Sequence, residues 1–202
     1  MSKNVNVSEK KILEVKDLIN VGIFSALYFV LYALTSCIGF VPVFIILVPV
    51  VCPIITGIPL MLYMAKIKKF GMLTITGIIV SAIMFVMGHP WLVLLTGTVC
   101  GFVADIVLKL GEYKSKKMSV ISYGIFSMWS TGAIISLFFG FKEKYLESYR
   151  AGYGDTYVDT LYKITPDWLF WVLVIGAFVG GLIGGMLGIA VLKKHFKKAG
   201  II

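Results

Sequence analysis

Asp105 is the one carboxylic acid that lies clearly inside an apolar segment of this chain. Burying an ionisable group in a membrane is costly, which makes such a residue a candidate for function. Lys109 follows one helical turn later, so the first interpretation is a structural ion pair at i, i+4 spacing. A substrate ligand or a proton carrier is the second interpretation of this carboxylate.

Aromatic residues and one histidine form the second group of candidates. Trp129 lies near the middle of an apolar segment, where its indole N–H needs an acceptor, so packing and a substrate pocket are both open. His89, Pro90 and Trp91 place a donor, a rigid bend and a ring side by side in a short turn. This arrangement suits a small polar or aromatic ligand, an ordinary loop histidine, or a tryptophan anchored in the membrane interface.

A helical face with semi-polar character runs through the segment that follows His89. Its members recur at alternating spacings of four and three, which places them on one side of a helix. We expect this face to turn toward the interior of a bundle; it comprises Trp91, Leu95, Thr98, Phe102 and Asp105. The candidate substrate-binding residues are therefore His89, Trp91, Thr98 and Trp129.

The sequence contains no recognisable catalytic set. His89 and His195 belong to different parts of the chain, and neither an HExxH motif nor a GxxxxGK[ST] nucleotide loop occurs. The cysteines, Cys37, Cys52 and Cys100, lie in apolar stretches without CxxC spacing, so we expect neither a disulfide nor a metal site. We expect no enzyme activity and no cofactor, and the energy for any active transport must come from elsewhere.

Membrane-spanning helices are the elements that must position these residues. Hydrophobic residues make up 59% and charged residues 14% of the 202 positions, and the mean hydropathy is +0.95, far above that of a soluble domain. No charged residue occurs from Leu18 to Ala65, about twice the roughly 20 residues that one crossing uses. Gly39 and Pro42 mark the break between two helices.

These observations predict an all-α, polytopic membrane protein, folded as a single domain in one compact bundle of six helices. Three prolines in the second span, Pro49, Pro53 and Pro59, predict that it is kinked or irregular beside a pocket. The expected spans lie at about 17–38, 43–65, 71–88, 91–110, 118–141 and 167–191.

Residues 142–166 form the only long connection between the expected spans. Tyrosine recurs there at every fourth position from Tyr145 to Tyr157, and acidic residues repeat with the same spacing on the opposite helical face. This pattern favours a helix at the membrane interface, either as an aromatic belt or as a lid over a binding site. Gly152 and Gly154 are expected to interrupt such a helix.

The distribution of lysine and arginine predicts the orientation. About 15 of the 19 basic residues fall on the side shared by both chain ends, and positively charged loops are retained in the cytoplasm. We therefore expect both termini and the tail over 1–16 to be cytoplasmic, and 142–166 to be extracellular. The net charge of +9 then reflects topology, and we expect no nucleic-acid partner.

Small residues mark two surfaces where helices can approach each other closely. In the last span, glycine recurs every four residues from Gly176 to Gly188, and packing within the bundle is the expected role. In the first span, Gly22 and Ala26 begin a second small-residue face. This face could dock either another helix of the same chain or a partner protein.

The stretch KDLINVGIFSALYFVLYAL in the first span and the ending KKHFKKAG are the strongest parts of a resemblance that covers nearly the whole chain. The chain resembles the S components of energy-coupling factor (ECF) transporters, and within them the Trep_Strep, or MptS-like, group. The resemblance implies a multi-pass protein of the prokaryotic plasma membrane. It would bind a vitamin or a similar micronutrient and work with a membrane-embedded T component and two ATPases.

The resemblance also implies roles for particular residues. A strip of small residues on the first helix of an S component contacts the T component, and Gly22 and Ala26 occupy it here, with glycine in place of the family's first alanine. Substrate pockets in the family lie toward the outer half, which favours His89, Trp91 and Trp129 over Asp105. The identity and charge of the substrate and the oligomeric state stay open.

The alternative hypothesis is a self-contained channel or secondary carrier. Such proteins commonly show inverted repeats or several buried ionisable groups along a path. The sequence shows no repeat and only Asp105 as a buried acid. An intramembrane enzyme is a third hypothesis, and it lacks every residue set that its chemistry would need.

Overall fold

A computed structural model describes residues 13–140 and 142–196, and these residues form a bundle of helices without any strand. The all-α class of a polytopic membrane protein is thereby confirmed. Most of the expected tail over 1–16, as well as Lys197 and Lys198 in the KKHFKKAG ending, lies outside the described residues. Five segments are long and apolar enough to cross a membrane: Val15–Phe40, Pro42–Lys66, Leu92–Leu110, Lys116–Leu137 and Asp167–Lys194.

The long charge-free run folds into two helices joined by a short irregular turn. Helix α1 spans Val15–Ser36 and is followed by a 3-10 turn, η1, at Cys37–Phe40. Val41 is extended, and a second 3-10 segment, η2, leads into α2 at Val48–Lys66. Much of the irregular backbone thus lies before α2, at 37–47, whereas Pro53 and Pro59 sit inside its continuous helix.

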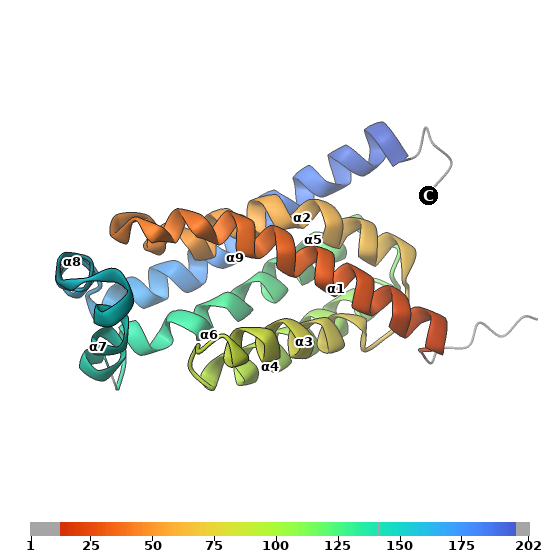
Figure 1. The fold of residues 1–202 in the computed structure, drawn as a ribbon. Coiled ribbons are helices and arrows are strands. Elements are labelled where there is room, and N and C mark those ends of the chain that lie inside the picture. Colours follow the sequence, from red (N-terminus) through yellow and green to blue (C-terminus); the bar gives the residue numbers. More distant parts are fainter. Residues whose placement is uncertain (1–12, 141, 197–202) are drawn as a thin grey trace, which may run out of the picture.

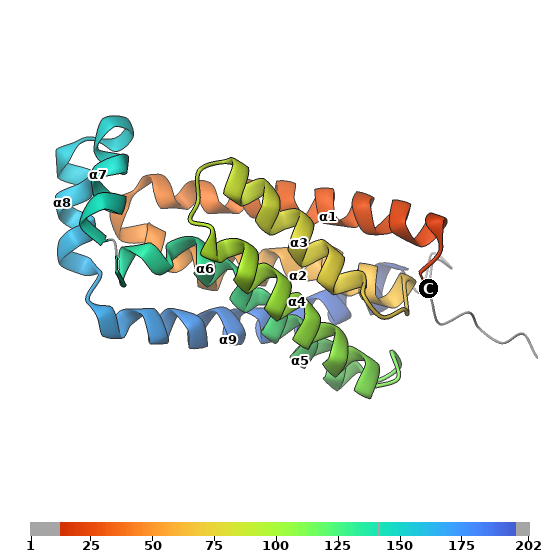
Figure 2. The same ribbon diagram turned by 90° about the horizontal axis from the view of Figure 1, so that it is seen from below.

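The third apolar segment is shorter than the five long ones. Helix α3 spans Met72–Val86 and α4 spans Leu92–Leu110, and the two helices pack side by side (Figure 2). At about 1.5 Å per residue the 15 residues of α3 reach about 22 Å, less than the roughly 30 Å of a bilayer's hydrocarbon core. The bundle therefore contains five long segments and one short apolar helix.

The fifth expected span is broken in its second half. Helix α5 spans Lys116–Ser127, and a 3-10 turn, η3, follows at Met128–Ser130. A single turn of α-helix, α6, covers Thr131–Ile134, and another 3-10 turn, η4, covers Ile135–Leu137. The backbone is thus irregular at Trp129.

The long connection folds into two helices that cover one end of the bundle (Figure 1). Helix α7 spans Lys142–Tyr153 and α8 spans Asp155–Ile164, and we call this pair the tyrosine hairpin. Gly154 joins them with a φ of +82°, a conformation that glycine adopts without steric cost. Helix α9 at Asp167–Val191 then runs the length of the bundle and continues into a π-helix, η5, at Leu192–Phe196.

Glycines allow α9 to pack directly against the backbone of α2. A Cβ atom added at Gly184 would lie 2.9 Å from Ile54 Cα, and one added at Gly188 would lie 2.7 Å from the Gly57 carbonyl oxygen. Gly181 faces α5 instead, where a Cβ would lie 2.8 Å from Gly124 Cα. The glycine ridge of the last span therefore packs within the bundle, as its four-residue spacing predicts.

The buried apolar side chains form two separate clusters. The larger one fills the centre of the bundle and includes Trp129, Tyr28 and Tyr63. The smaller one joins the tyrosine hairpin to the beginning of α9, with Leu161 and Phe170 among its members. The hairpin thus has a core of its own, distinct from the core of the helices beneath it.

Candidate substrate site

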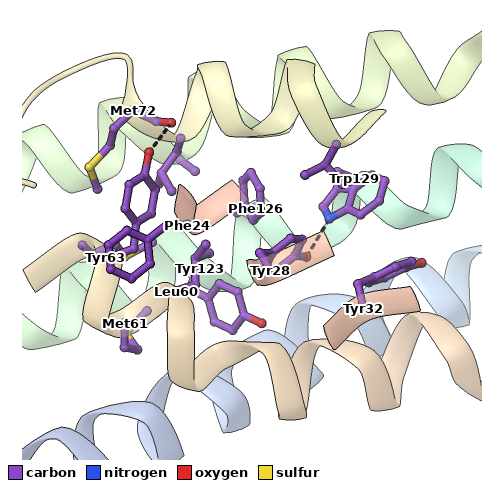
Figure 3. Close-up of a cluster of buried hydrophobic side chains, with 14 of the residues drawn as sticks. Phe24, Tyr28, Tyr32, Leu60, Met61, Tyr63, Met72, Tyr123, Phe126 and Trp129 are labelled. Carbon is purple, nitrogen blue, oxygen red and sulfur yellow. Dashed lines mark hydrogen bonds between the residues drawn. The ribbon is translucent and has the colours of Figure 1, made fainter. Parts of the chain in front are cut away.

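Four aromatic side chains gather in the middle of the bundle, and Figure 3 shows their arrangement. Trp129 is fully buried, and its indole N–H donates a hydrogen bond to the Tyr28 hydroxyl at 2.8 Å. The Tyr32 ring centroid lies 5.1 Å from that of Trp129, and Phe126 meets Tyr28 edge-on at 5.6 Å. We call Tyr28, Tyr32, Phe126 and Trp129 the aromatic cluster.

A side chain of α4 satisfies the backbone where the fifth segment breaks. The Thr96 hydroxyl donates to the Trp129 carbonyl oxygen at 2.9 Å. A Cβ atom at Gly132 would collide with the Thr96 side chain, so glycine at this position permits the close approach. Irregular backbone at membrane depth is tolerated where protein satisfies it, and it often marks binding sites in transporters.

His89 lies in the connection between α3 and α4, close to the backbone of Ala133 in α6. Burial lowers the pKa of His89 below its usual value, and the nearby backbone carbonyl of Ala133 offsets part of this shift. The Tyr145 hydroxyl donates to the same Ala133 carbonyl at 3.2 Å. Ala133 stands four residues after Trp129 in the chain, so His89 and Tyr145 converge just beyond the aromatic cluster.

The Nδ1 atom of His89 is buried and has no hydrogen-bond partner among the described residues. A buried polar atom without a partner carries a cost of about 1–3 kcal/mol. A bound molecule that offers one polar group to this nitrogen would remove that cost. His89 and Trp129 are thus the two predicted site residues that the structure brings toward the same region.

Trp91 and Thr98 are not brought together with Trp129. Trp91 is 62% exposed, and the exposed Thr98 donates its hydroxyl hydrogen bond to Leu94 of its own helix. Leu95 and Phe102 are exposed as well, so the prediction that this helical face looks into the bundle is wrong for every member except the buried Asp105. The inward face of α4 carries Gly97 and Gly101, because close packing in lipid selects small side chains rather than polar ones.

Asp105 serves as a helix cap and not as half of an ion pair. It is completely buried and accepts hydrogen bonds from the Leu73 N–H at 3.2 Å and the Thr74 N–H at 2.8 Å. The Thr74 hydroxyl adds a third bond at 2.6 Å. The predicted pairing with Lys109 is wrong, since that ammonium group lies over the Phe70 ring, 5.4 Å from its centroid. Asp105 therefore satisfies first-turn N–H groups of α3.

The tyrosine hairpin is held to the bundle by an aromatic stack. Successive ring centroids of Tyr145, Tyr149, Tyr153 and Tyr157 lie 5.0, 5.4 and 4.7 Å apart. The pKa of Tyr157 is raised by burial to about 12, so its hydroxyl keeps its proton and donates to the Gly39 carbonyl at 2.7 Å. The stack thus connects the hairpin to the turn between α1 and α2.

The acidic residues of the hairpin have a separate role. Arg150 donates hydrogen bonds to Glu147 at 2.8 Å and to Asp155 at 2.7 Å, and Asp159 lies 3.7 Å from the same guanidinium group. The pairs with Asp155 and Asp159 join α7 to α8 beside a cavity of about 240 Å³. The acidic face therefore stabilises the hairpin itself, while the tyrosine face contacts the bundle.

Gly22 and Ala26 lie on the outward surface of α1. Both are exposed, and a Cβ atom at Gly22 would meet no heavy atom within 4 Å. Ser25 points the other way and donates to the Thr76 hydroxyl at 3.0 Å. The sequence left open whether this surface docks another helix of the chain or a partner protein. Among the described residues, no other helix of the chain covers it at Gly22.

A protein-family model described as a hypothetical bacterial integral membrane protein, Trep_Strep, matches residues 15–198. The chain belongs to this family. No curated protein and no solved structure matches it. The family assignment agrees with the membrane fold of this Trep_Strep protein, and it assigns no chemical role to any residue.

Four residues of the candidate site in the Trep_Strep protein were not predicted: Tyr28, Tyr32, Thr96 and Tyr145. Tyr28 and Tyr32 carried a usable signal, because hydroxyl groups four residues apart in a charge-free helix need buried partners. Thr96 carried none, since a threonine in a membrane helix commonly bonds to its own backbone.

Proposed function

We propose that this protein is the substrate-binding subunit of an ATP-driven importer of the ECF type, which captures a vitamin or another small micronutrient. The observation that carries the proposal is the position of Gly22 and Ala26 on an open surface of α1. Small residues allow the backbones of two membrane helices to approach each other. A surface of this kind, left uncovered by the chain's own helices, suits a membrane-embedded partner.

The interior of the bundle supports the capture half of the proposal. Trp129, Tyr28 and Tyr32 are almost completely buried, so a ligand reaches their rings only when the surrounding packing opens. The tyrosine hairpin has its own apolar core and contacts the bundle through a few hydroxyl bonds and ring contacts. Displacement of this hairpin would give a molecule access to His89 and then to Trp129.

The energy for release comes from partner proteins in this proposal. The chain has no nucleotide-binding loop, so a T component and two ATPases supply ATP hydrolysis. Docking and substrate capture would then use different surfaces, the outward side of α1 and the interior beneath the hairpin. This separation allows each activity to be disrupted without the other.

Tryptophan in place of Gly22 or Ala26 is expected to abolish co-purification with a T component and the ATPases, because a large ring prevents close helix approach. Substrate binding should be unchanged. The measurement is affinity purification of the tagged protein from its own cells, followed by detection of the partner subunits. Val179→Trp is the control, since it adds the same ring to an exposed position on α9. Undiminished complex formation by both α1 variants would contradict the docking assignment.

Native mass spectrometry of the purified protein should reveal a retained small molecule. His89→Gln is expected to weaken its binding by about 10-fold, the effect of losing one good hydrogen bond in a buried site. Trp129→Phe is expected to weaken binding as well, because it removes the N–H that holds the Tyr28 hydroxyl in place. Thr98→Ala is the matched control, because its hydroxyl faces away from the site. Substrate transport by the purified chain alone in liposomes would favour the self-contained carrier instead.

A further inference from the structure

A second cavity lies at the opposite end of the bundle from the tyrosine hairpin. It has a volume of about 700 Å³ and is bordered by the end of α2, the connection from α4 to α5, the start of α5 and the end of α9. Pockets that bind organic molecules commonly measure about 300–1,000 Å³. Part of its wall is apolar and consists of Met61, Met64, Ile189 and Leu192. We call it the lysine cavity.

Five lysines from separate elements line this cavity. Lys66 ends α2 and Lys68 follows it, Lys114 precedes α5, Lys116 begins α5, and Lys193 lies in η5. All five are exposed, and none forms an ion pair with an acidic group in the described part of the chain. No carboxylate lines the cavity within the same part. Among the described residues, the lining of the lysine cavity therefore has a positive charge that no lining acid offsets.

Helix α5 adds to this charge because it begins at the cavity with Lys116. The first N–H groups of a helix carry a partial positive charge. The Ser115 hydroxyl accepts the Met118 N–H at 3.4 Å, a long bond that satisfies only one of them. Lysines near helix ends are common in membrane proteins because positively charged loops are retained in the cytoplasm. That rule does not require five lysines around one cavity with an apolar wall.

We propose that the lysine cavity binds the headgroup of an anionic phospholipid. The lysines would contact the phosphate oxygens, and the methionine and isoleucine side chains would contact the first carbons of the acyl chains. Basic pockets between membrane helices bind such headgroups. A lipid fits this cavity because its apolar wall continues to the outer surface of the bundle. Ile189 lies one turn from Met186, which is 56% exposed on the outer surface of α9.

The test uses the full-length protein in nanodiscs of phosphatidylcholine with a titrated fraction of phosphatidylglycerol. The protein is then released from the nanodiscs, and native mass spectrometry counts the lipids that stay bound to it. The triple variant Lys68→Gln, Lys116→Gln, Lys193→Gln should retain phosphatidylglycerol about 100-fold less tightly, at about 5-fold for each lysine near a membrane surface. Phosphatidylcholine retention should not change.

The matched control is the triple variant Lys16→Gln, Lys117→Gln, Lys194→Gln. It removes the same charge from the same end of the molecule, at lysines that do not line the cavity. Retention of phosphatidylglycerol by this control supports a specific site, and equal loss from both variants would overturn it. Competition with glycerol 3-phosphate distinguishes a free phosphate ligand, because full displacement at low concentration would contradict a lipid site.

Discussion

Replacing Gly184 by leucine is expected to prevent this protein from folding. The new Cβ would collide with the Pro53 carbonyl and lie 2.9 Å from Ile54 Cα and 3.0 Å from the Ile54 carbonyl oxygen. These are backbone atoms of α2, so the clash is relieved only if α2 and α9 separate. Overpacking commonly costs about 1–3 kcal/mol, and separating the two helices adds their lost packing, enough to unfold a marginally stable protein.

The measurement is size-exclusion chromatography of a fluorescent fusion in mild detergent. Gly184→Leu should give aggregated protein in place of a single symmetric peak. Gly22→Leu is the matched control, because it makes the same change in another membrane helix where nothing lies within 4 Å of the new Cβ. That variant should retain the peak of the unmodified protein. A normal peak and an unchanged melting temperature for Gly184→Leu would show that α2 and α9 are not packed through Gly184.

The contrast between α9 and α4 explains which parts of the packing could be predicted. Spacing of small residues located the buried ridge of α9 correctly. The same criterion applied to α4 would have selected Gly97 and Gly101, whereas the semi-polar stripe selected Thr98 and the wrong face. In lipid, a lone hydroxyl is satisfied by its own helix, so polarity alone says little about which side faces inward.

The tyrosine hairpin was partly predictable. Four tyrosines at four-residue spacing indicate a helical face, and glycine near the centre indicates an interruption, which the structure places at Gly154. The attachment point was not predictable from these residues. It depends on the carbonyls of Gly39 and Ala133, and every residue carries a carbonyl, so no side chain in the sequence identifies these two as partners.

The break at Trp129 also lies beyond local sequence rules. The stretch from Met128 to Gly132 contains no proline, and its irregular backbone depends on the Thr96 hydroxyl of another helix. Trp129 itself was identified because a buried indole needs an acceptor. Its acceptor, Tyr28, stands 101 residues away, and only the folded arrangement of α1 against η3 brings the two together.

Asp105→Ala is expected to destabilise the protein by at least about 1–3 kcal/mol, the cost of leaving a buried polar group without its partner. The loss leaves two backbone N–H groups and the Thr74 hydroxyl at the start of α3 without their acceptor. Asp105→Asn retains one acceptor oxygen and should cost less. The measurement is the thermal unfolding midpoint in detergent, followed by tryptophan fluorescence.

Lys109→Ala separates the two interpretations of Asp105. An ion pair requires both partners, so it predicts comparable losses of stability for Asp105→Ala and Lys109→Ala. A helix cap requires only the carboxylate, and the Lys109 ammonium contributes a cation–π contact with Phe70 that is worth about 0.5–1 kcal/mol at an exposed site. We therefore expect Lys109→Ala to lower the unfolding midpoint far less. Equal shifts for the two variants would instead support an ion pair between Asp105 and Lys109, because the contribution of Asp105 would then depend on the lysine.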